Sequence, residues 1–166
     1  MVSRRSRPFQ QVDVFAPRPG TGNPLAVVFD AADLDDAQMQ AIALWTNLAE
    51  TTFVLPASTA DADYRVRIFT TQREIAFAGH PSIGTAHAVL ATGLAKARNG
   101  MLVQECQAGL LPVRVIDTQG RQSLSVRVPR SRIVADDGAA RDKLAALVPA
   151  ERRGALPPAL VEGGRR

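Results

Sequence analysis

The chain has 166 residues, 46% of them hydrophobic and 22% charged, a composition typical of a globular domain. A chain of this length buries roughly 70% of its unfolded surface, so size alone permits a stable core. The net charge of +4 comes from basic residues, nearly all arginine, spread along the sequence, and aromatic residues make up only 5%. Without a recognition motif or aromatics for base stacking, these features argue against a nucleic-acid partner.

Cysteine and histidine usage excludes further classes. Cys106 is the single cysteine and there are two histidines, so neither an internal disulfide nor a structural zinc set can be assembled. There is no phosphate-loop or dinucleotide fingerprint, and we expect no metal and no cofactor. No apolar run approaches the roughly 20 residues of a membrane span, and the arginines near the start precede no signal-like stretch, which predicts a cytoplasmic protein without a membrane partner.

The first part of the chain predicts two strands and a helix. Residues 9–15 alternate as a strand does, and turn residues at 17–24 interrupt them. The apolar run at 25–29 predicts a strand covered on both faces. A helix follows, with Asp33 as its expected N-cap and an apolar face at helical spacing formed by Leu34, Ala37, Ala41, Leu44 and Trp45.

Further strands then surround a second helix. Residues 51–55 and 64–70 are rich in β-branched and aromatic residues and predict strands. The helix at 82–90 has apolar or small residues almost all round, which predicts burial, and we expect His87 to lie in the core. Three segments, 101–106, 110–116 and 123–128, predict an antiparallel meander. After them we expect a linker at 129–137, a short helix at 138–147 and a short strand at 160–161.

Residues 69–85 read FTTQREIAFAGHPSIGT and place a Gly-His-Pro turn between a strand and the buried helix. Proline is favoured in the first turn of a helix, and the N–H groups and dipole there attract anions. We therefore expect a carboxylate ligand near Gly79, His80, Pro81 and Ser82. The structural alternative for His80 is a histidine that only satisfies a backbone group at the helix start.

Three motifs together resemble the phenazine-biosynthesis PhzF-like family in order and spacing: GNPLAV at 22–27, NLAETTFV at 47–54 and FTTQREIAFAGHP at 69–81. The resemblance implies an α+β, diaminopimelate epimerase-like fold, in which each of two halves wraps a twisted, mostly antiparallel sheet around a buried central helix. It predicts that residues 1–128 form an N-terminal half and 129–166 a linker and an incomplete start of the second half. A second half-domain or a homodimer partner is then expected to be needed.

The resemblance also implies a function. It predicts a cofactor-independent isomerase that moves a proton by general acid–base catalysis on a small carboxylate-bearing metabolite. Glu50 would be the proton shuttle, and Glu74 would steady the Gly-His-Pro turn. The substrate-binding residues would be Gly79, His80, Pro81, Ser82 and Asn23. From the sequence pattern alone, both glutamates could instead be solvated strand residues.

Two other functions compete with this one. The first is a catalytically inactive, half-length relic or a binding module of the same fold. The second, an epimerase with two thiols, is disfavoured because Ala78 stands where the thiol-dependent enzymes of this fold carry a cysteine, and because Cys106 is expected to be a small buried residue on a strand.

Overall fold

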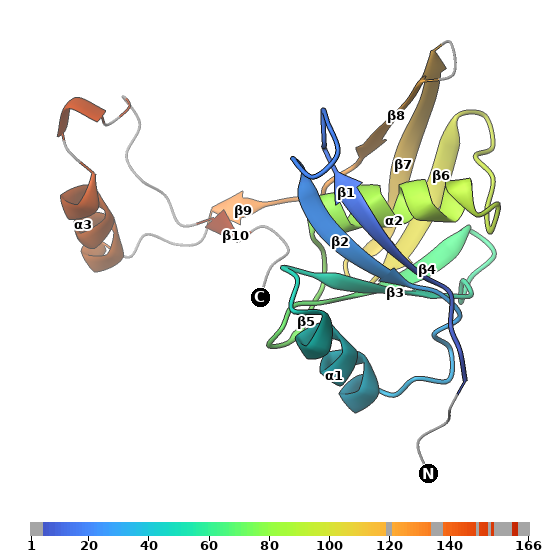
Figure 1. Ribbon diagram of the computed structural model, residues 1–166. Coiled ribbons are helices and arrows are strands. Elements are labelled where there is room, and N and C mark those ends of the chain that lie inside the picture. Colours follow the sequence, from blue (N-terminus) through green and yellow to red (C-terminus); the bar gives the residue numbers. More distant parts are fainter. Residues whose placement is uncertain are drawn as a thin grey trace.

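A computed structural model of the chain describes residues 5–118, 121–133, 138–148, 150–152, 154 and 161–162. The strands in these ranges are β1 (Phe9–Val14), β2 (Asn23–Val28), β3 (Thr51–Leu55), β4 (Tyr64–Phe69), β5 (Glu74–Ile75), β6 (Met101–Cys106), β7 (Gly109–Thr118), β8 (Arg121–Val126), β9 (Arg132–Ile133) and β10 (Val161–Glu162). The helices are α1 (Asp36–Thr46), α2 (Gly79–Ala91) and α3 (Gly138–Leu147), with a 3₁₀ turn at Ala150–Arg152. The main sheet curls around α2 and carries α1 on its outer face (Figure 1), which confirms the predicted α+β fold.

The main sheet has the strand order β1-β2-β3-β4-β6-β7-β8, with β5 beside β4. Strands β2 and β3 are parallel, and their neighbours β1 and β4 pair with them antiparallel. Along one edge, β4 has two partners: its start pairs in parallel with β6, and its end pairs antiparallel with β5. Strands β6, β7 and β8 form the predicted antiparallel meander, although β7 is longer than expected.

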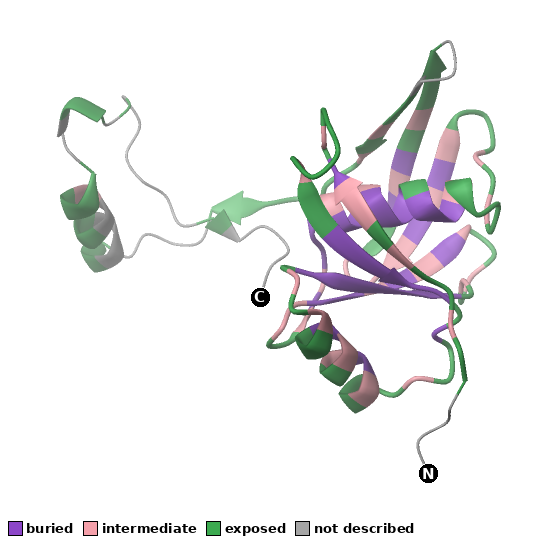
Figure 2. Cartoon of the chain, viewed as in Figure 1, coloured by how far each residue is buried: buried purple, intermediate pink, exposed green. Residues whose placement is uncertain are grey.

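Helix α2 fills the concave side of the sheet and packs against β1, β2, β3, β6 and β8. Small residues allow this close approach on several sides. At Gly84, a Cβ atom would lie 2.6 Å from the side chains of both Leu25 and Val14. Most of α2 is buried (Figure 2), as predicted. His87 differs from the prediction: it is exposed, because it faces a groove between β1 and β8, where the sheet does not close.

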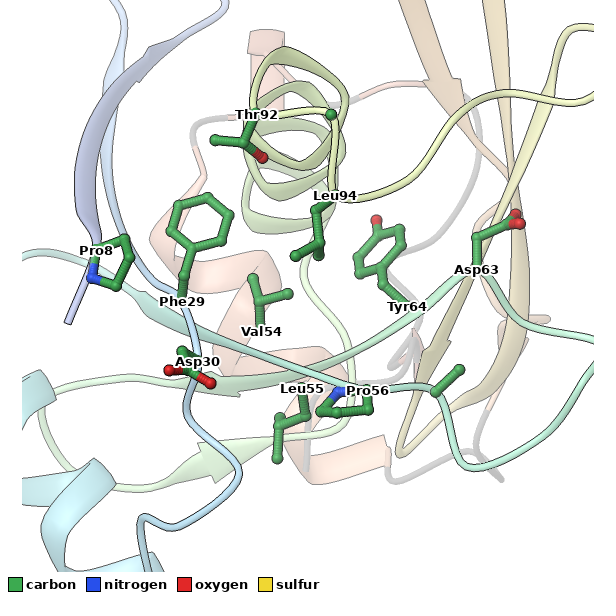
Figure 3. A pocket seen from close by; sticks show the side chains of 12 residues that line it. Pro8, Phe29, Asp30, Val54, Leu55, Pro56, Asp63, Tyr64, Thr92 and Leu94 are labelled. Carbon is green, nitrogen blue, oxygen red and sulfur yellow. The ribbon is translucent and has the colours of Figure 1, made fainter.

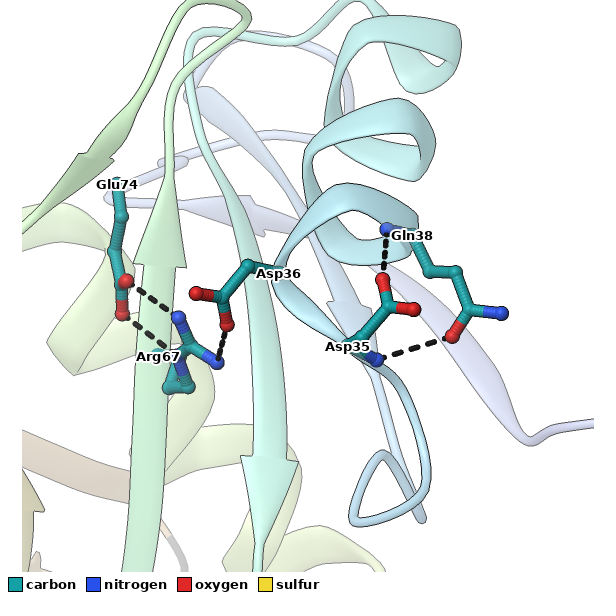
Figure 4. A network of polar contacts seen from close by, with 5 residues as sticks. All are labelled: Asp35, Asp36, Gln38, Arg67 and Glu74. Carbon is teal, nitrogen blue, oxygen red and sulfur yellow. Dashed lines mark hydrogen bonds and ion pairs between the residues drawn. The ribbon is translucent and has the colours of Figure 1, made fainter.

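Helix α1 covers the outer face of β3 and β4. Its N-cap is Asp35 rather than the predicted Asp33: Asp35 accepts from the N–H of Gln38, whose side chain accepts from the N–H of Asp35 (Figure 4). Asp33 instead binds the Arg7 guanidinium, which lowers the pKa of that carboxyl.

The buried side of α1 also differs from the prediction. Met39 and Ala43 are buried in a hydrophobic cluster between α1 and the sheet, which also contains Phe53 and Phe69. Leu44 is 61% exposed and so does not belong to the buried face. Trp45, at 82%, lies on the surface as well.

The turn between β1 and β2 is held by one carboxylate. Asp13 accepts hydrogen bonds from the N–H groups of Gly20 and Gly22, at 2.7 and 2.9 Å. A Cβ atom at Gly22 would lie 2.3 Å from the backbone oxygen of Val14, so a larger residue does not fit there. The chain consequently enters β2 at a fixed position, with Asn23 as the first residue of the strand.

After β8, the described residues comprise α3, the 3₁₀ turn and an antiparallel pair formed by β9 and β10. Figure 1 shows α3 away from the main sheet. The predicted helix at 138–147 is confirmed, and of the predicted strand at 160–161 the first residue lies outside the described ranges. The division into 1–128 and 129–166 stays a prediction. None of the described helices combines the length and hydropathy needed to cross a membrane.

Candidate active site

Glu50 occupies the junction between α1 and β3. Helix α1 ends at Thr46, and its C-cap Asn47 has a left-handed backbone (φ 53°) that breaks the helix before the sheet. The Thr46 and Thr51 hydroxyls lie 2.7 Å apart across this junction, and Thr51 is fully buried. Glu50 is only 4% exposed, so its carboxyl group is almost entirely shielded from solvent.

His80, in the first turn of α2, meets this carboxylate. Its Nε2 lies 3.6 Å from Oε2 of Glu50, and the two side chains are 8% and 6% exposed. At 3.6 Å the pair is too long for a direct hydrogen bond, but catalytic contacts in unliganded sites are often longer than in the reacting complex. Two motifs 30 residues apart thus supply a carboxylate and an imidazole to one place.

The N-terminus of α2 opens at this same point. Its N-cap, Ala78, has no side chain that can cap the helix, and the first turn contains no acidic residue. The N–H groups of the first helical turn have no acceptor within the helix. Pro81 has no N–H, so Gly79 and His80 supply the donors of this end. Their orientation and the helix dipole favour an anion.

Ser82 lies behind this turn. Its N–H and its hydroxyl both donate to the backbone oxygen of Ala78, at 3.2 and 2.9 Å. The side chain is fully buried. Direct contact with a substrate stays a prediction for Gly79, His80, Pro81 and Ser82. For Ser82 it has to compete with the bonds that its N–H and hydroxyl make inside the fold.

Gly79 and Gly84 give a matched pair of substitutions in one helix. A Cβ atom at Gly79 would meet nothing within 4 Å, and the backbone there is not left-handed. We expect Gly79→Ala to leave unfolding free energy unchanged or to raise it by up to about 0.5–1 kcal/mol, while weakening carboxylate binding at the turn. Gly84→Ala should lower it by about 1–3 kcal/mol because of overpacking. Urea unfolding and ligand titration of both variants measure these effects. If both variants are destabilised equally, the proposal that Gly79 binds a ligand is contradicted.

The side chain of Glu74 is hydrogen-bonded to Arg67, and its role in steadying the Gly-His-Pro turn stays a prediction. Both of its carboxylate oxygens accept from Arg67, at 2.8 and 2.5 Å, and Arg67 also donates to Asp36 at 2.7 Å (Figure 4). The hydrogen bonds to Glu74 raise the pKa of the guanidinium. Because β5 precedes the turn and Asp36 begins α1, this network ties together two elements that lead to the site. An effect of Glu74 on the turn would have to pass through the backbone of β5.

Asn23 is exposed at the start of β2. It lies three residues before Ala26, the register partner of Thr51. Since β2 and β3 are parallel, Asn23 is at the same end of the sheet as Glu50. Its contact with a substrate stays a prediction.

A cavity of about 760 Å³ lies at the other end of α2 (Figure 3). Its walls are mainly apolar and include Phe29, Val54 and Leu94, and the ring of Tyr64 forms one side. The rim carboxylates already have partners: Asp30 binds Arg5, and Asp63 binds Arg98. This cavity contains neither Glu50 nor His80, so it is separate from the candidate site at the N-terminal end of the helix.

Sequence reasoning missed a buried polar group next to this site. Gln104 is fully buried on β6, with its amide hydrogen-bonded to Tyr64 and Ser82. The sequence pattern could have indicated this position, because Gln104 lies on the same face of the strand as Leu102, an apolar core residue. A glutamine at an inward position requires partners in the core.

Cys106, on β6, is half-buried and distant in sequence from the turn. Burial raises the pKa of its thiol, so the thiolate fraction near neutral pH is lower than in a free cysteine. We expect iodoacetamide at pH 8 to react about tenfold more slowly with the folded chain than with the urea-unfolded chain. Mass spectrometry over time measures both rates. Rapid labelling of the folded chain, together with loss of turnover when the labelled chain is tested in the assembled protein, would contradict a thiol-independent site.

A buried carboxylate and an imidazole thus lie 3.6 Å apart at the N-terminus of α2, on a fold in which a curled sheet encloses this helix. The chain belongs to the phenazine biosynthesis-like (PhzC-PhzF) family, whose family model matches residues 12–166. This result confirms the resemblance found in the sequence motifs.

Relatives of the chain include named isomerases. It is 44% identical over 127 residues to antisense-enhancing sequence 1 of Schizosaccharomyces pombe, covering 76% of this chain and 43% of that protein. It is 43% identical over 110 residues to the trans-2,3-dihydro-3-hydroxyanthranilate isomerase of Pseudomonas aeruginosa, covering 66% of this chain and 38% of that enzyme. A solved structure from P. aeruginosa, described as a predicted epimerase, superimposes with a TM-score of 0.74 at 35% identity, covering 94% of this chain and 56% of the other. The chain spans less than half the length of these two curated relatives.

Proposed function

We propose that this chain supplies one half of the active site of a cofactor-independent isomerase that acts on a small carboxylate-bearing metabolite. The observation that carries the proposal is the Glu50–His80 pair, 3.6 Å apart and nearly buried, at the N-terminal end of α2. The relative in P. aeruginosa is named as an isomerase of a hydroxyanthranilate, which is a carboxylate. A substrate of that class suits the site.

The proposed reaction moves one proton between two carbon atoms of the substrate. Glu50, as carboxylate, takes the proton from one carbon and returns it to another, so the enzyme ends in its starting state. His80 lies close enough to orient this carboxylate or to polarise the substrate. A positioned acid–base group of this kind contributes on the order of 10²- to 10⁴-fold in rate.

The substrate carboxylate would bind to the N–H groups of Gly79 and His80. A helix N-terminus contributes only about 0.3–1 kcal/mol to binding an anion at an exposed position. Millimolar affinity requires about 4.1 kcal/mol. Further contacts are therefore needed, and we propose that they come from a second half-domain or from a second copy of the chain.

Solvent deuterium incorporation tests the proposal. The assembled protein is incubated in D₂O with trans-2,3-dihydro-3-hydroxyanthranilate and, in parallel, with simple carboxylates that have an acidic C–H bond. Proton NMR then follows exchange at carbon. Catalysed exchange supports an isomerase, whereas binding without exchange by any of these compounds would favour the alternative of a binding module of the same fold.

A further inference from the structure

Three buried side chains connect the wall of the apolar cavity to the first turn of α2. The Tyr64 hydroxyl donates to Oε1 of Gln104 at 3.1 Å, and Nε2 of Gln104 donates to Oγ of Ser82 at 3.0 Å. The Ser82 hydroxyl in turn donates to the backbone oxygen of Ala78 at 2.9 Å. All three side chains are at most 1% exposed.

The direction of this chain follows from its last member. The Ala78 oxygen can only accept, so the single Ser82 hydroxyl proton is used there and Ser82 accepts from the amide of Gln104. The amide oxygen of Gln104 then faces the Tyr64 hydroxyl, which must donate. Burial raises the pKa of Tyr64, so this donor stays protonated throughout the working pH range. Every link therefore points toward the helix N-terminus.

The last acceptor belongs to the Ala78–Gly79 peptide group, whose N–H is that of Gly79. The oxygen of this group receives two hydrogen bonds, from the Ser82 hydroxyl and from the Ser82 N–H. Resonance couples the oxygen and nitrogen of a peptide group, so bonds to the oxygen draw electron density from the N–H. Consecutive hydrogen bonds strengthen one another by about 10–30% per bond.

We propose that Ser82 and Gln104, with Tyr64 at the outer end, are positioning residues that fix the Ala78–Gly79 peptide plane and strengthen Gly79 N–H as a donor to the substrate carboxylate. The proposal rests on the proposed function for the identity of that ligand. It explains why three polar side chains lie in a core where apolar residues of similar size would fit. It also explains how a helix whose N-cap residue is an alanine keeps its first peptide group in one orientation.

The same helix contains a control. Thr85 is also fully buried, and its hydroxyl donates to Thr52 at 2.9 Å. Thr85 is one turn beyond Ser82 and has no bond to the Ala78 oxygen among the described contacts. Removing its hydroxyl disturbs a comparable buried hydrogen bond without touching the Gly79 peptide group.

The experiment uses the full 166-residue chain labelled with ¹⁵N-glycine. The Gly79 amide signal is identified by its absence in Gly79→Ala. Acetate is titrated at constant ionic strength into wild type, Ser82→Ala, Gln104→Met, Tyr64→Phe and Thr85→Val. We expect an upfield shift of the Gly79 amide proton in the first two variants, and an initial slope of its acetate titration that is smaller by up to about twofold. A smaller change is expected in Tyr64→Phe, and none in Thr85→Val.

Three results would overturn the proposal: wild-type values in both Ser82→Ala and Gln104→Met, an equal change in Thr85→Val, or no response of Gly79 to acetate in the wild type. If Ser82→Ala does not fold, Gln104→Met and Tyr64→Phe still report on the same bond. Acetate binding needs no turnover, so this measurement is independent of whether the protein is an isomerase. If the assembled protein catalyses no deuterium exchange, the proposed function is refuted. The differences in the Gly79 amide signal among the variants would still support the positioning role.

Discussion

Glu50→Gln should reduce solvent deuterium incorporation by about 10²- to 10⁴-fold in the assembled enzyme, the full contribution of a positioned acid–base group. Glutamine keeps the shape of glutamate but cannot carry the proton. We expect the fold and the substrate Kd to change little, since the side chain is replaced by one of the same volume. Single-turnover exchange, followed by NMR, measures the rate, and a substrate titration measures the affinity.

A matched change at a remote glutamate is the control. Glu105 lies on β6, where its carboxylate accepts from the backbone N–H of Ser58 at 2.7 Å, and hydrogen bonds from Ser58 lower the pKa of Glu105. Glu105→Gln removes one negative charge away from the site and should leave exchange within a factor of about two of the wild type. Near wild-type exchange in Glu50→Gln would exclude Glu50 as the proton carrier.

The second large effect concerns assembly. We expect the 166-residue chain alone to show no turnover, and we expect turnover to appear when a separately produced second half of a full-length relative is added. The groups that this chain supplies, one carboxylate, one imidazole and one helix end, fall short of millimolar affinity for a substrate. Binding of the second half should raise the thermal midpoint, because a partner present at 100 times its Kd stabilises the native state by about 2.7 kcal/mol.

The controls for assembly use variants of this chain. Glu50→Gln in the mixture should remain inactive, although its thermal midpoint should still rise, which separates docking from chemistry. Sedimentation velocity would show whether a second copy takes the place of the added half. An active monomer of the 166-residue chain, indifferent to the added half, would contradict the proposal of a shared site.

Much of the fold could be predicted from local pattern. The small, apolar segment at α2 predicted a buried helix, and the alternating segments after it predicted the meander of β6, β7 and β8. The placement of Glu50 and His80 together came from motif resemblance. The spacing of Glu50 and His80, 30 residues apart, does not predict that the carboxylate and the imidazole lie 3.6 Å from each other.

The errors have a common physical origin. A sequence pattern shows which residues are apolar, but it does not show which sides of a helix the sheet leaves uncovered. His87 was expected in the core, yet it faces the groove between β1 and β8. Leu44 and Trp45 follow the helical spacing of α1, but the sheet contacts the side marked by Met39 and Ala43. Long-range contacts decided each of these positions.

The enclosure of α2 also has a consequence for synthesis of the chain. The helix packs against both β1 and β8, and β8 ends at Val126, 35 residues after α2 ends at Ala91. A ribosome adds about 5–20 residues per second, so the completed helix waits about 2–7 s before its last covering strand exists. Contacts between such distant segments also favour slow folding. During that interval the side of α2 that β8 later covers has no partner in the chain made so far.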